Sequence, residues 1–265
     1  MTELSVTEIT IYPVKSLRGI NLSSTLIERR GPRYDRHWMV IDAHHNFLTQ
    51  RQIPRMSLID VQLTESMLIL SHADESVEIS LQTPTLPAIE VNVWNDCVAA
   101  TDMGDEVAEW LSQLLKQPCR LVAMQQSYER QVDLNYATAG DIVGFADGFA
   151  SLLISEASLA DFNTHLAKKI TMRHFRPNIV VAGCEPYAED TWQRIRIGSI
   201  EFDVVKPCSR CAIPTINPDT AQRSPAIWQA LTQQRERDGK VFFGQNLVHK
   251  QVGEIKLGDK IELLC

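Results

Sequence analysis

The first hundred residues consist largely of short stretches in which apolar and polar side chains alternate. Clear examples are LSVTEITIYPV (4–14), MLILSH (67–72) and IEVNVW (89–94). A repeat of two residues is the pattern of a β-strand with one buried face. Turn-forming residues separate the stretches, as at 44–46 and 74–76. So many short strands at close spacing predict a barrel or a sandwich rather than repeated βαβ units.

Helical periodicity appears in three later stretches, at 105–116, 155–169 and 224–237. The second stretch begins at Ser155, and the third begins at Ser224 followed by Pro225. Serine is favoured at the residue that caps a helix, and proline is favoured at the first helical position. We therefore expect a few helices beside a larger number of strands.

These elements predict a strand-rich α+β fold in two parts. The first helix closes an N-terminal β-rich part, residues 1–120, and the second part comprises residues 121–265. The polar segment 125–141 is the softest boundary, and we take it as a candidate rim of a substrate entrance. Residues 252–265 alternate on both sides of Gly258–Asp259 and predict a closing hairpin.

Charge and cysteine content narrow the functional classes. The formal net charge is -7, so the chain as a whole has no general attraction for nucleic acid or anionic lipid. No apolar run reaches the ~20 residues of a membrane span, and no secretory segment opens the chain. The six cysteines are scattered through a long chain, which favours reduced thiols over a disulfide scaffold. These features predict a cytoplasmic protein.

A Cys-x-x-Cys pair is formed by Cys208 and Cys211. Structural zinc and iron–sulfur clusters take four ligands, and the sequence has no second pair at a matching spacing. A redox pair usually opens a helix, whereas the Ala-Ile-Pro that follows favours a strand or loop. Side chains three positions apart in an extended backbone point to opposite faces. The pair therefore fits one functional thiol beside a structural neighbour, and two buried cysteines without a role are the alternative.

Basic residues recur near this pair and in three other segments, which are 12–19, 29–38 and 172–180. Lys206 and Arg210 would favour the thiolate form of a neighbouring cysteine. Arginine binds phosphate oxygens through two parallel hydrogen bonds, and lysine binds them as a point charge. An anionic, phosphate-bearing ligand held beside one thiolate explains all four clusters together. Solvated surface charge is the alternative for each cluster taken alone.

Longer motifs resemble the MOSC-domain proteins, in the branch that contains the mitochondrial amidoxime-reducing component and its bacterial relatives. They follow the same order along nearly the whole chain and are IYPVKS (11–16), DRHWMVID (35–42), LTQRQIPRM (48–56), LLISEASLADFN (152–163), FRPNIVVAG (175–183), CEPYAEDTW (184–192), CSRCAIPTINPDT (208–220) and FGQN (243–246). The resemblance implies a MOSC-type β-barrel domain preceded by a β-rich N-terminal lobe of the MOSC_N type.

The same resemblance implies a molybdenum cofactor, a phosphate-bearing pyranopterin dithiolene whose metal is also bound by a protein cysteine. In this family the second cysteine of C-x-R-C binds the metal, which assigns metal ligation and catalysis to Cys211 and a structural role to Cys208. The positions that bind pterin and phosphate correspond to Lys15, Ser16, Arg36, Asp147, Arg176, Asn178, Ser209 and Arg210, with Gln245 and Asn246 close to the site. Pyridoxal phosphate is a second ligand that the resemblance leaves to consider.

The implied activity is the reduction of N-hydroxylated compounds such as amidoximes, N-hydroxylated bases and hydroxylamines, as in N-reductive detoxification. Some bacterial relatives continue into a ferredoxin-like domain with a 2Fe–2S cluster, whereas this chain ends at Cys265. Electrons are therefore expected from a separate flavoprotein, iron–sulfur protein or cytochrome. The alternative is a cofactor carrier or a sulfur-transfer (sulfurase-like) module that has no reductase turnover.

Overall fold

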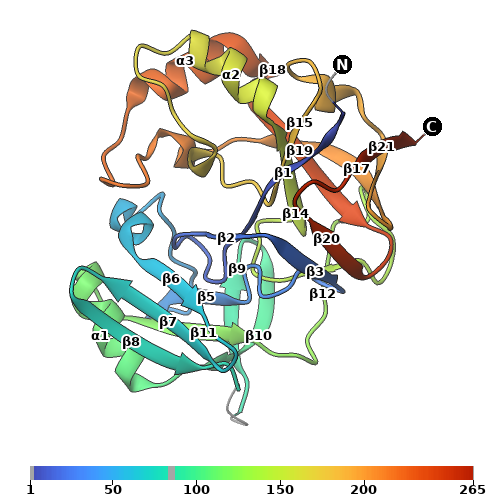
Figure 1. Ribbon diagram of the computed structural model, residues 1–265. Coiled ribbons are helices and arrows are strands. Elements are labelled where there is room, and N and C mark those ends of the chain that lie inside the picture. Colours follow the sequence, from blue (N-terminus) through green and yellow to red (C-terminus); the bar gives the residue numbers. More distant parts are fainter. Residues whose placement is uncertain (1–2, 83–86, 265) are drawn as a thin grey trace.

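The computed structural model describes residues 3–82 and 87–264, which form two packed, strand-rich parts (Figure 1). The largest element of this described chain is a nine-stranded sheet. In spatial order its strands are β2 (Ile20–Leu22), β1 (Ser5–Ile11), β15 (Ile179–Ala182), β14 (Ser151–Ser155), β19 (Lys240–His249), β17 (Ile200–Ser209), β16 (Arg194–Ile197) and β21 (Ile261–Leu264), and β18 (Glu236–Arg237) pairs with β19.

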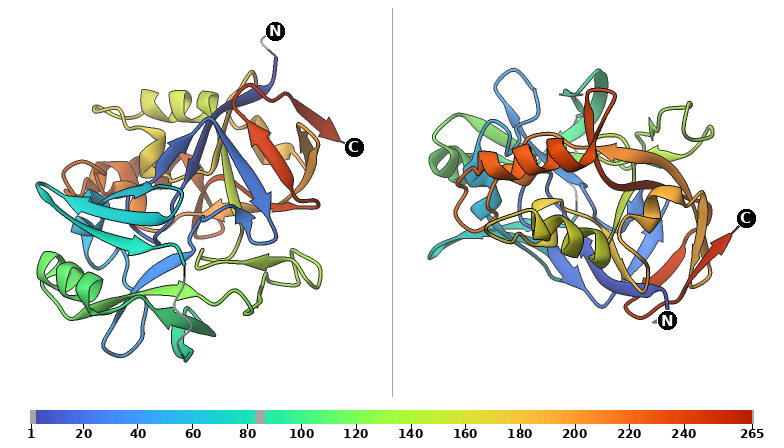
Figure 2. Two further views of the ribbon diagram at one scale, coloured as in Figure 1. Left: turned by 60° about the horizontal axis from the view of Figure 1, so that its bottom comes forward. Right: turned by 90° about the horizontal axis from the view of Figure 1, so that it is seen from above.

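The two faces of this sheet bury different sets of side chains. In β14, Leu152 and Ile154 pack into the core beneath the helices, whereas Leu153 packs into the core on the opposite face. Helices α2 (Glu156–Thr164) and α3 (Pro225–Arg235) lie side by side over the first face (Figure 2). The alternation seen in the sequence therefore continues through a strand that is covered on both sides.

Local chemistry sets the ends of the three predicted helices, all of which form. The first, α1, spans Asp105–Leu115, and Ser155 caps α2 by accepting a hydrogen bond from the backbone N–H of Ser158. Helix α2 ends at Thr164 and not at 169, because the side-chain amide of Asn163 bonds both backbone groups of Ile170 and turns the chain. Ser224 precedes α3 as predicted, but its hydroxyl does not cap the helix.

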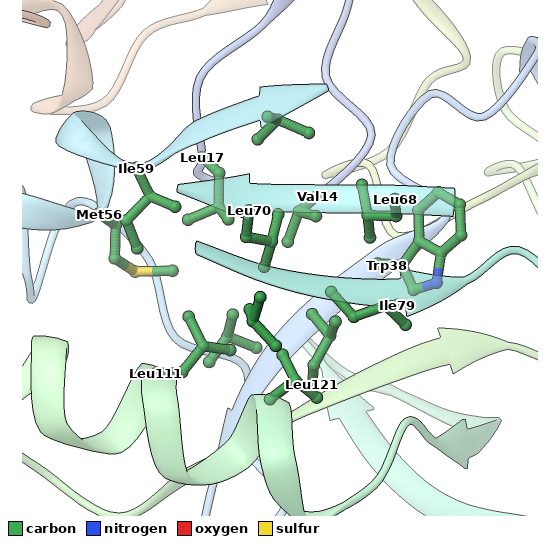
Figure 3. Packing of buried hydrophobic residues seen from close by; sticks show 14 of the residues in the cluster. Val14, Leu17, Trp38, Met56, Ile59, Leu68, Leu70, Ile79, Leu111 and Leu121 are labelled. Carbon is green, nitrogen blue, oxygen red and sulfur yellow. The ribbon is translucent and has the colours of Figure 1, made fainter. Parts of the chain in front are cut away.

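The other structural part is built from strands between residues 38 and 124, which form a four-stranded sheet and a three-stranded meander with one core between them. The sheet is formed by β5 (Trp38–Asp42), β11 (Cys119–Met124), β10 (Asp96–Asp102) and β9 (Ile89–Val93), and the meander by β6 (Asp60–Leu63), β7 (Met67–His72) and β8 (Glu75–Ser80). Figure 3 shows Leu68, Leu70 and Ile79 of the meander facing Leu111 of α1 and Leu121 of β11. Burial of each such side chain contributes about 1.5–3 kcal/mol, so this core stabilises the packing of the meander on the four-stranded sheet.

The prediction of a closing hairpin is wrong, because the two last strands do not pair with each other. Residues 253–264 form two strands, but β20 (Gly253–Lys256) pairs with β3 (Ser24–Glu28) and β21 pairs with β16. The backbone groups of the turn are used by the N-terminal strands, because Leu257 N donates to Ser23 O and Gly258 N donates to Val6 O. Strand β4 (Gly31–Pro32) completes the small sheet with β3, and Cys265 lies outside the described residues.

Strands from the N-terminal part of the sequence pair with strands from the C-terminal part. Strand β1 pairs with β15, and β3 pairs with β20, so the division at residue 120 does not coincide with a division between sheets. The remaining described elements are β12 (Arg130–Gln131) paired with β13 (Ile142–Val143), and the 3₁₀ turns η1 (Pro54–Leu58), η2 (Met172–His174), η3 (Ala188–Thr191) and η4 (Ile213–Thr215).

None of the helices in the described part of the chain is long and apolar enough to cross a membrane. The cytoplasmic location stays a prediction.

Burial of one histidine predicts a loss of stability in mild acid. The ring of His37 packs edge-on against Trp38 at 4.6 Å, and burial lowers the pKa of His37 to about 4. Below pH 6.5 the unfolded chain protonates this histidine while the folded chain does not, so folding loses stability as the pH falls to about 4. We expect this group alone to remove up to about 3 kcal/mol between pH 7 and pH 4.

Urea denaturation as a function of pH tests this expectation in wild-type protein and in His37→Gln. The variant should show the shallower loss between pH 6.5 and pH 4. His44 is exposed, so His44→Gln should follow the wild-type curve and serves as the matched control. Parallel curves for wild type and His37→Gln would contradict the assignment.

Candidate functional site

A cavity of about 140 Å³ lies where loops from both parts of the sequence meet. Lys15 and Ser16 follow β1, Arg176 and Asn178 precede β15, and Cys211 follows β17. All the predicted site residues except Gln245 line this cavity, namely Lys15, Ser16, Arg36, Asp147, Arg176, Asn178, Ser209, Arg210, Cys211 and Asn246. The three basic segments of the sequence thus each bring one cation to the same place.

Gln245 does not reach the cavity. Its side chain is buried, and its amide donates a hydrogen bond of 2.7 Å to Asp190, which also pairs with Arg235. In β19 the neighbouring Asn246 points the other way, lines the cavity and donates to the carbonyl of Lys206. The alternation of the strand explains why only one residue of this Gln-Asn pair faces the site.

The two cysteines of the C-x-x-C lie in different surroundings. Cys208, near the end of β17, packs against the core beneath α2 and α3, and its Sγ lies 3.1 Å from Nη1 of Arg210. Cys211 lies beyond the end of the strand, half-buried at the cavity, with Nη1 of Arg51 at 3.7 Å from its Sγ. Both cysteines line the cavity, and both are free thiols.

An ion pair between the buried Lys15 and the more exposed Asp147 forms one side of the cavity. Nζ of Lys15 lies 2.5 Å from Oδ1 of Asp147 and 2.7 Å from the carbonyl of Phe145. Burial lowers the pKa of Lys15 against the opposing effect of Asp147. For Asp147, burial alone would raise the pKa, but Lys15 and Arg51 outweigh it and hold the pKa well below its usual range. Asp147 is therefore an ionised hydrogen-bond acceptor at neutral pH.

A second network fixes Arg36. Oδ2 of Asp35 lies 2.6 Å from Nη1 of Arg36, while Oδ1 accepts hydrogen bonds from Tyr12 N and from Asn178 Nδ2. The amide oxygen of Asn178 accepts from Arg36 and from Leu152 N, and its nitrogen also donates to Thr10. All the ordinary hydrogen-bonding positions of Asn178 are used, so its amide positions the guanidinium of Arg36.

Arg176 is held against an aromatic ring. Its guanidinium lies over the ring of Tyr12 at 4.1 Å, and burial lowers the pKa of Arg176 to about 10, which leaves it charged at neutral pH. Burial also raises the pKa of Tyr12 to about 12, so this ring stays neutral. A neutral aromatic face supports the guanidinium without neutralising its charge.

Backbone strain and unpaired polar atoms concentrate at this cavity. Ser16, Arg36 and Arg176 have φ angles of 69°, 47° and 57°, a region that non-glycine residues rarely adopt. Among the described residues, three buried polar atoms of the cavity wall have no hydrogen-bond partner: Arg176 Nη2, Arg210 Nε and Ser151 Oγ. Buried donors without partners are rare, so this wall has the character of a site for an anionic ligand.

A wider cavity of about 680 Å³ adjoins the narrow one and shares the wall that contains Asp147 and Cys211. Its lining includes Arg130, Gln131 and Asp133 of the segment 125–141, and the role of this segment as the rim of a substrate entrance stays a prediction. The described residues contain no group of three or more His, Cys, Asp or Glu side chains that could hold a metal ion.

Arg51 and Trp94 were not among the predicted site residues. Arg51 lines both cavities, and Trp94, which is 52% exposed, lines the wider one. Arg51 belongs to the motif LTQRQIPRM, so the motif contained the signal although no role was assigned to the residue. Trp94 comes near Arg51 only through the turn between β9 and β10, which local sequence does not reveal.

The chain is similar in sequence to known proteins over both of its parts. Residues 3–118 match the MOSC N-terminal beta barrel domain, and residues 140–262 match the MOSC domain. Mitochondrial amidoxime-reducing component 1 of Homo sapiens is 36% identical over 279 residues, which cover 98% of this chain and 83% of that protein. Mitochondrial amidoxime reducing component 2 of Rattus norvegicus is 33% identical over 280 residues, with 97% and 82% covered. The solved YUAD protein of Bacillus subtilis aligns with a TM-score of 0.45 at 11% identity, covering 98% of this chain and 94% of that one.

Proposed function

Because this chain belongs to the MOSC-domain family, in the branch of the amidoxime-reducing components, we propose that it is a molybdenum-dependent reductase of N-hydroxylated compounds. Its substrates are amidoximes, N-hydroxylated bases and hydroxylamines, and a separate donor protein supplies its electrons. The names of the relatives, which state that they reduce amidoximes, support the reaction class.

One observation carries the proposal. Five cations surround a single narrow cavity together with the thiol of Cys211, and the one carboxylate among the described lining residues is Asp147. The cations are Lys15, Arg36, Arg51, Arg176 and Arg210. The positive charge of Lys15, Arg36, Arg176 and Arg210, with two guanidinium nitrogens unpartnered, fits the phosphate of a molybdenum cofactor, and a thiolate is a ligand that suits a soft metal ion.

The residues divide into three roles. Lys15, Arg36 and Arg176 hold the phosphate, and Asn178 orients Arg36 for this contact. Ser16, Ser209, Arg210 and Asn246 would contact the pterin, and Asp147 would serve as a hydrogen-bond acceptor for it. Cys211 is the protein ligand of the metal, and Cys208 supports it from the core.

When bound, the molybdenum centre would supply two electrons for cleavage of the N–O bond, which with two protons yields water and the amine, or the amidine where the substrate is an amidoxime. The chain itself contributes binding, orientation and a field of fixed charges. Because Asp147 stays ionised at neutral pH, it acts as a hydrogen-bond acceptor and not as the proton source.

The test is elemental analysis of protein purified from a host that makes the cofactor, combined with fluorescence of the oxidised pterin. We expect about one molybdenum and one pterin per chain, and turnover of an amidoxime with a reductant. Folded wild-type protein without metal and pterin would refute the proposal. Cofactor that is present but released readily, with sulfur on Cys211 and no turnover, would favour the carrier or sulfur-transfer alternative.

A further inference from the structure

Arg51 and Cys211 both line the two adjoining cavities, and Nη1 of Arg51 lies 3.7 Å from Sγ of Cys211. We propose that Arg51 is the substrate-positioning residue, whose guanidinium binds the oxygen of the substrate's N–O group. This inference rests on the proposed function, because it assumes that reduction takes place beside Cys211. It assigns to Arg51 a role separate from holding the cofactor.

The surroundings of Arg51 fix the plane of its guanidinium. The group lies over the ring of Trp94 at 4.6 Å and near the ring of Phe47 at 5.9 Å. Nη1 lies 3.7 Å from Oδ2 of Asp147, whose other oxygen accepts a hydrogen bond of 3.2 Å from Nε1 of Trp94. Stacking and charge therefore act together, and the side chain is only 21% exposed. A guanidinium held in this way loses little conformational entropy when it binds a ligand.

The same arrangement leaves part of Arg51 free. Its contacts with Cys211 and Asp147 both use Nη1, and among the described residues neither Nε nor Nη2 has a hydrogen-bond partner. Neither nitrogen is a fully buried atom, so both remain accessible to a ligand. Lys15, Arg36 and Arg210, in contrast, each donate to a protein oxygen.

A free guanidinium edge at this position suits the leaving oxygen. Reduction of R–NH–OH takes up two electrons from the donor protein and two protons from solvent, breaks the N–O bond and releases R–NH₂ and water. Negative charge grows on the oxygen while the bond breaks, and a fixed cation stabilises that charge without giving up its proton. Trp94 would form an apolar wall for the rest of the substrate, which favours flat, unsaturated groups beside the N–OH.

The experiment uses molybdenum-loaded protein and benzamidoxime as the probe. We expect Arg51→Gln to lower kcat/KM by about 10²-fold, the scale on which loss of one preorganised donor lowers a rate. Arg51→Lys keeps the charge but not the planar fork, and should lose about tenfold. Arg55→Gln, in the same segment, removes a guanidinium that bonds the carbonyl of Leu114, and should keep wild-type kinetics.

A binding measurement separates substrate positioning from other roles. The probe should quench tryptophan fluorescence in oxidised wild-type protein, the quenching should disappear in Trp94→Phe, and Arg51→Gln should raise the dissociation constant by about tenfold or more. Molybdenum and pterin content should stay at the wild-type level in Arg51→Gln.

Three outcomes decide the matter. Loss of cofactor in Arg51→Gln would make Arg51 a cofactor ligand and overturn the inference, as would kinetics and binding within about threefold of wild type. If Arg51→Gln does not fold, Arg51→Lys gives the same two readings. Wild-type protein without metal or turnover would instead overturn the proposed function, and this inference with it.

Discussion

Replacement of Cys211 by alanine is expected to abolish turnover of N-hydroxylated substrates while the chain remains folded. The loss should be at least about 10³-fold, the upper scale for removing one group from a preorganised site, because the metal would lose its protein ligand. The thiol is half-buried beyond the end of β17 and belongs to none of the described hydrophobic clusters, so truncation should change the melting temperature little. Steady-state kinetics and thermal melting measure the two effects.

The neighbouring cysteine is the matched control for this result. Cys208 packs against the core beneath α2 and α3, so Cys208→Ala should keep the metal and lose on the order of 1 kcal/mol of stability. Cys97 is exposed and lines neither cavity, so Cys97→Ala should behave as wild type. X-ray absorption of loaded protein should lose one metal–sulfur distance in Cys211→Ala only. Equal spectra from wild type and Cys211→Ala would refute the assignment of the ligand.

The largest loss of stability is expected from Asp35→Ala. This carboxylate is 7% exposed and bonds Arg36, Tyr12 N and Asn178 at 2.6, 2.8 and 3.0 Å. Its removal leaves a guanidinium, a backbone N–H and an amide without their acceptor in the interior. Breaking a buried pair in this way costs about 3–5 kcal/mol, a large part of the total stability of a typical domain. Urea denaturation at constant pH measures the change.

The same substitution should also weaken cofactor binding, because Arg36 loses the group that orients it. Purified Asp35→Ala should therefore contain less molybdenum and pterin per chain than wild type. Asp60 provides the control, since it pairs with Arg18 at 2.7 Å but is 49% exposed. Such exposed pairs contribute about 0–1 kcal/mol, so Asp60→Ala should be nearly neutral. A similar small effect from Asp35→Ala would show that its network relaxes without cost.

Local sequence signals predicted the elements of this fold better than their pairing. Strands and helices follow from alternation and capping, and all three helices were found, although α2 ends at Thr164 and not at 169. The closing hairpin failed because periodicity identifies a strand but does not identify its partner. The turn at 257–259 is held by residues 6 and 23, and no local pattern near residue 258 indicates strands so distant in sequence.

The site was predictable to a similar extent. Basic side chains beside rigid or turn-forming residues pointed to one anion site, and Lys15, Arg36 and Arg176 do meet at one cavity. Arg51 and Trp94 were missed because their importance to the site comes from the stacking of one side chain on the other, and local sequence does not reveal this contact. Gln245 was included because it shares the motif FGQN with Asn246, and only the position of each residue in β19 shows that Asn246 alone faces the cavity.

Pairing of the first strand with β15 has a consequence for biosynthesis. Ser5 stands opposite Ala182 in the sheet. A ribosome that adds about 5–20 residues per second would finish the partner strand roughly 10–35 s after the first strand. Until then, β1 can pair only with the short strand β2, so its edge towards β15 stays open, and an open apolar strand edge is a template for association with other nascent chains. A gene divided near codon 120 should therefore yield an N-terminal fragment that aggregates, and coexpression of both fragments should restore its solubility.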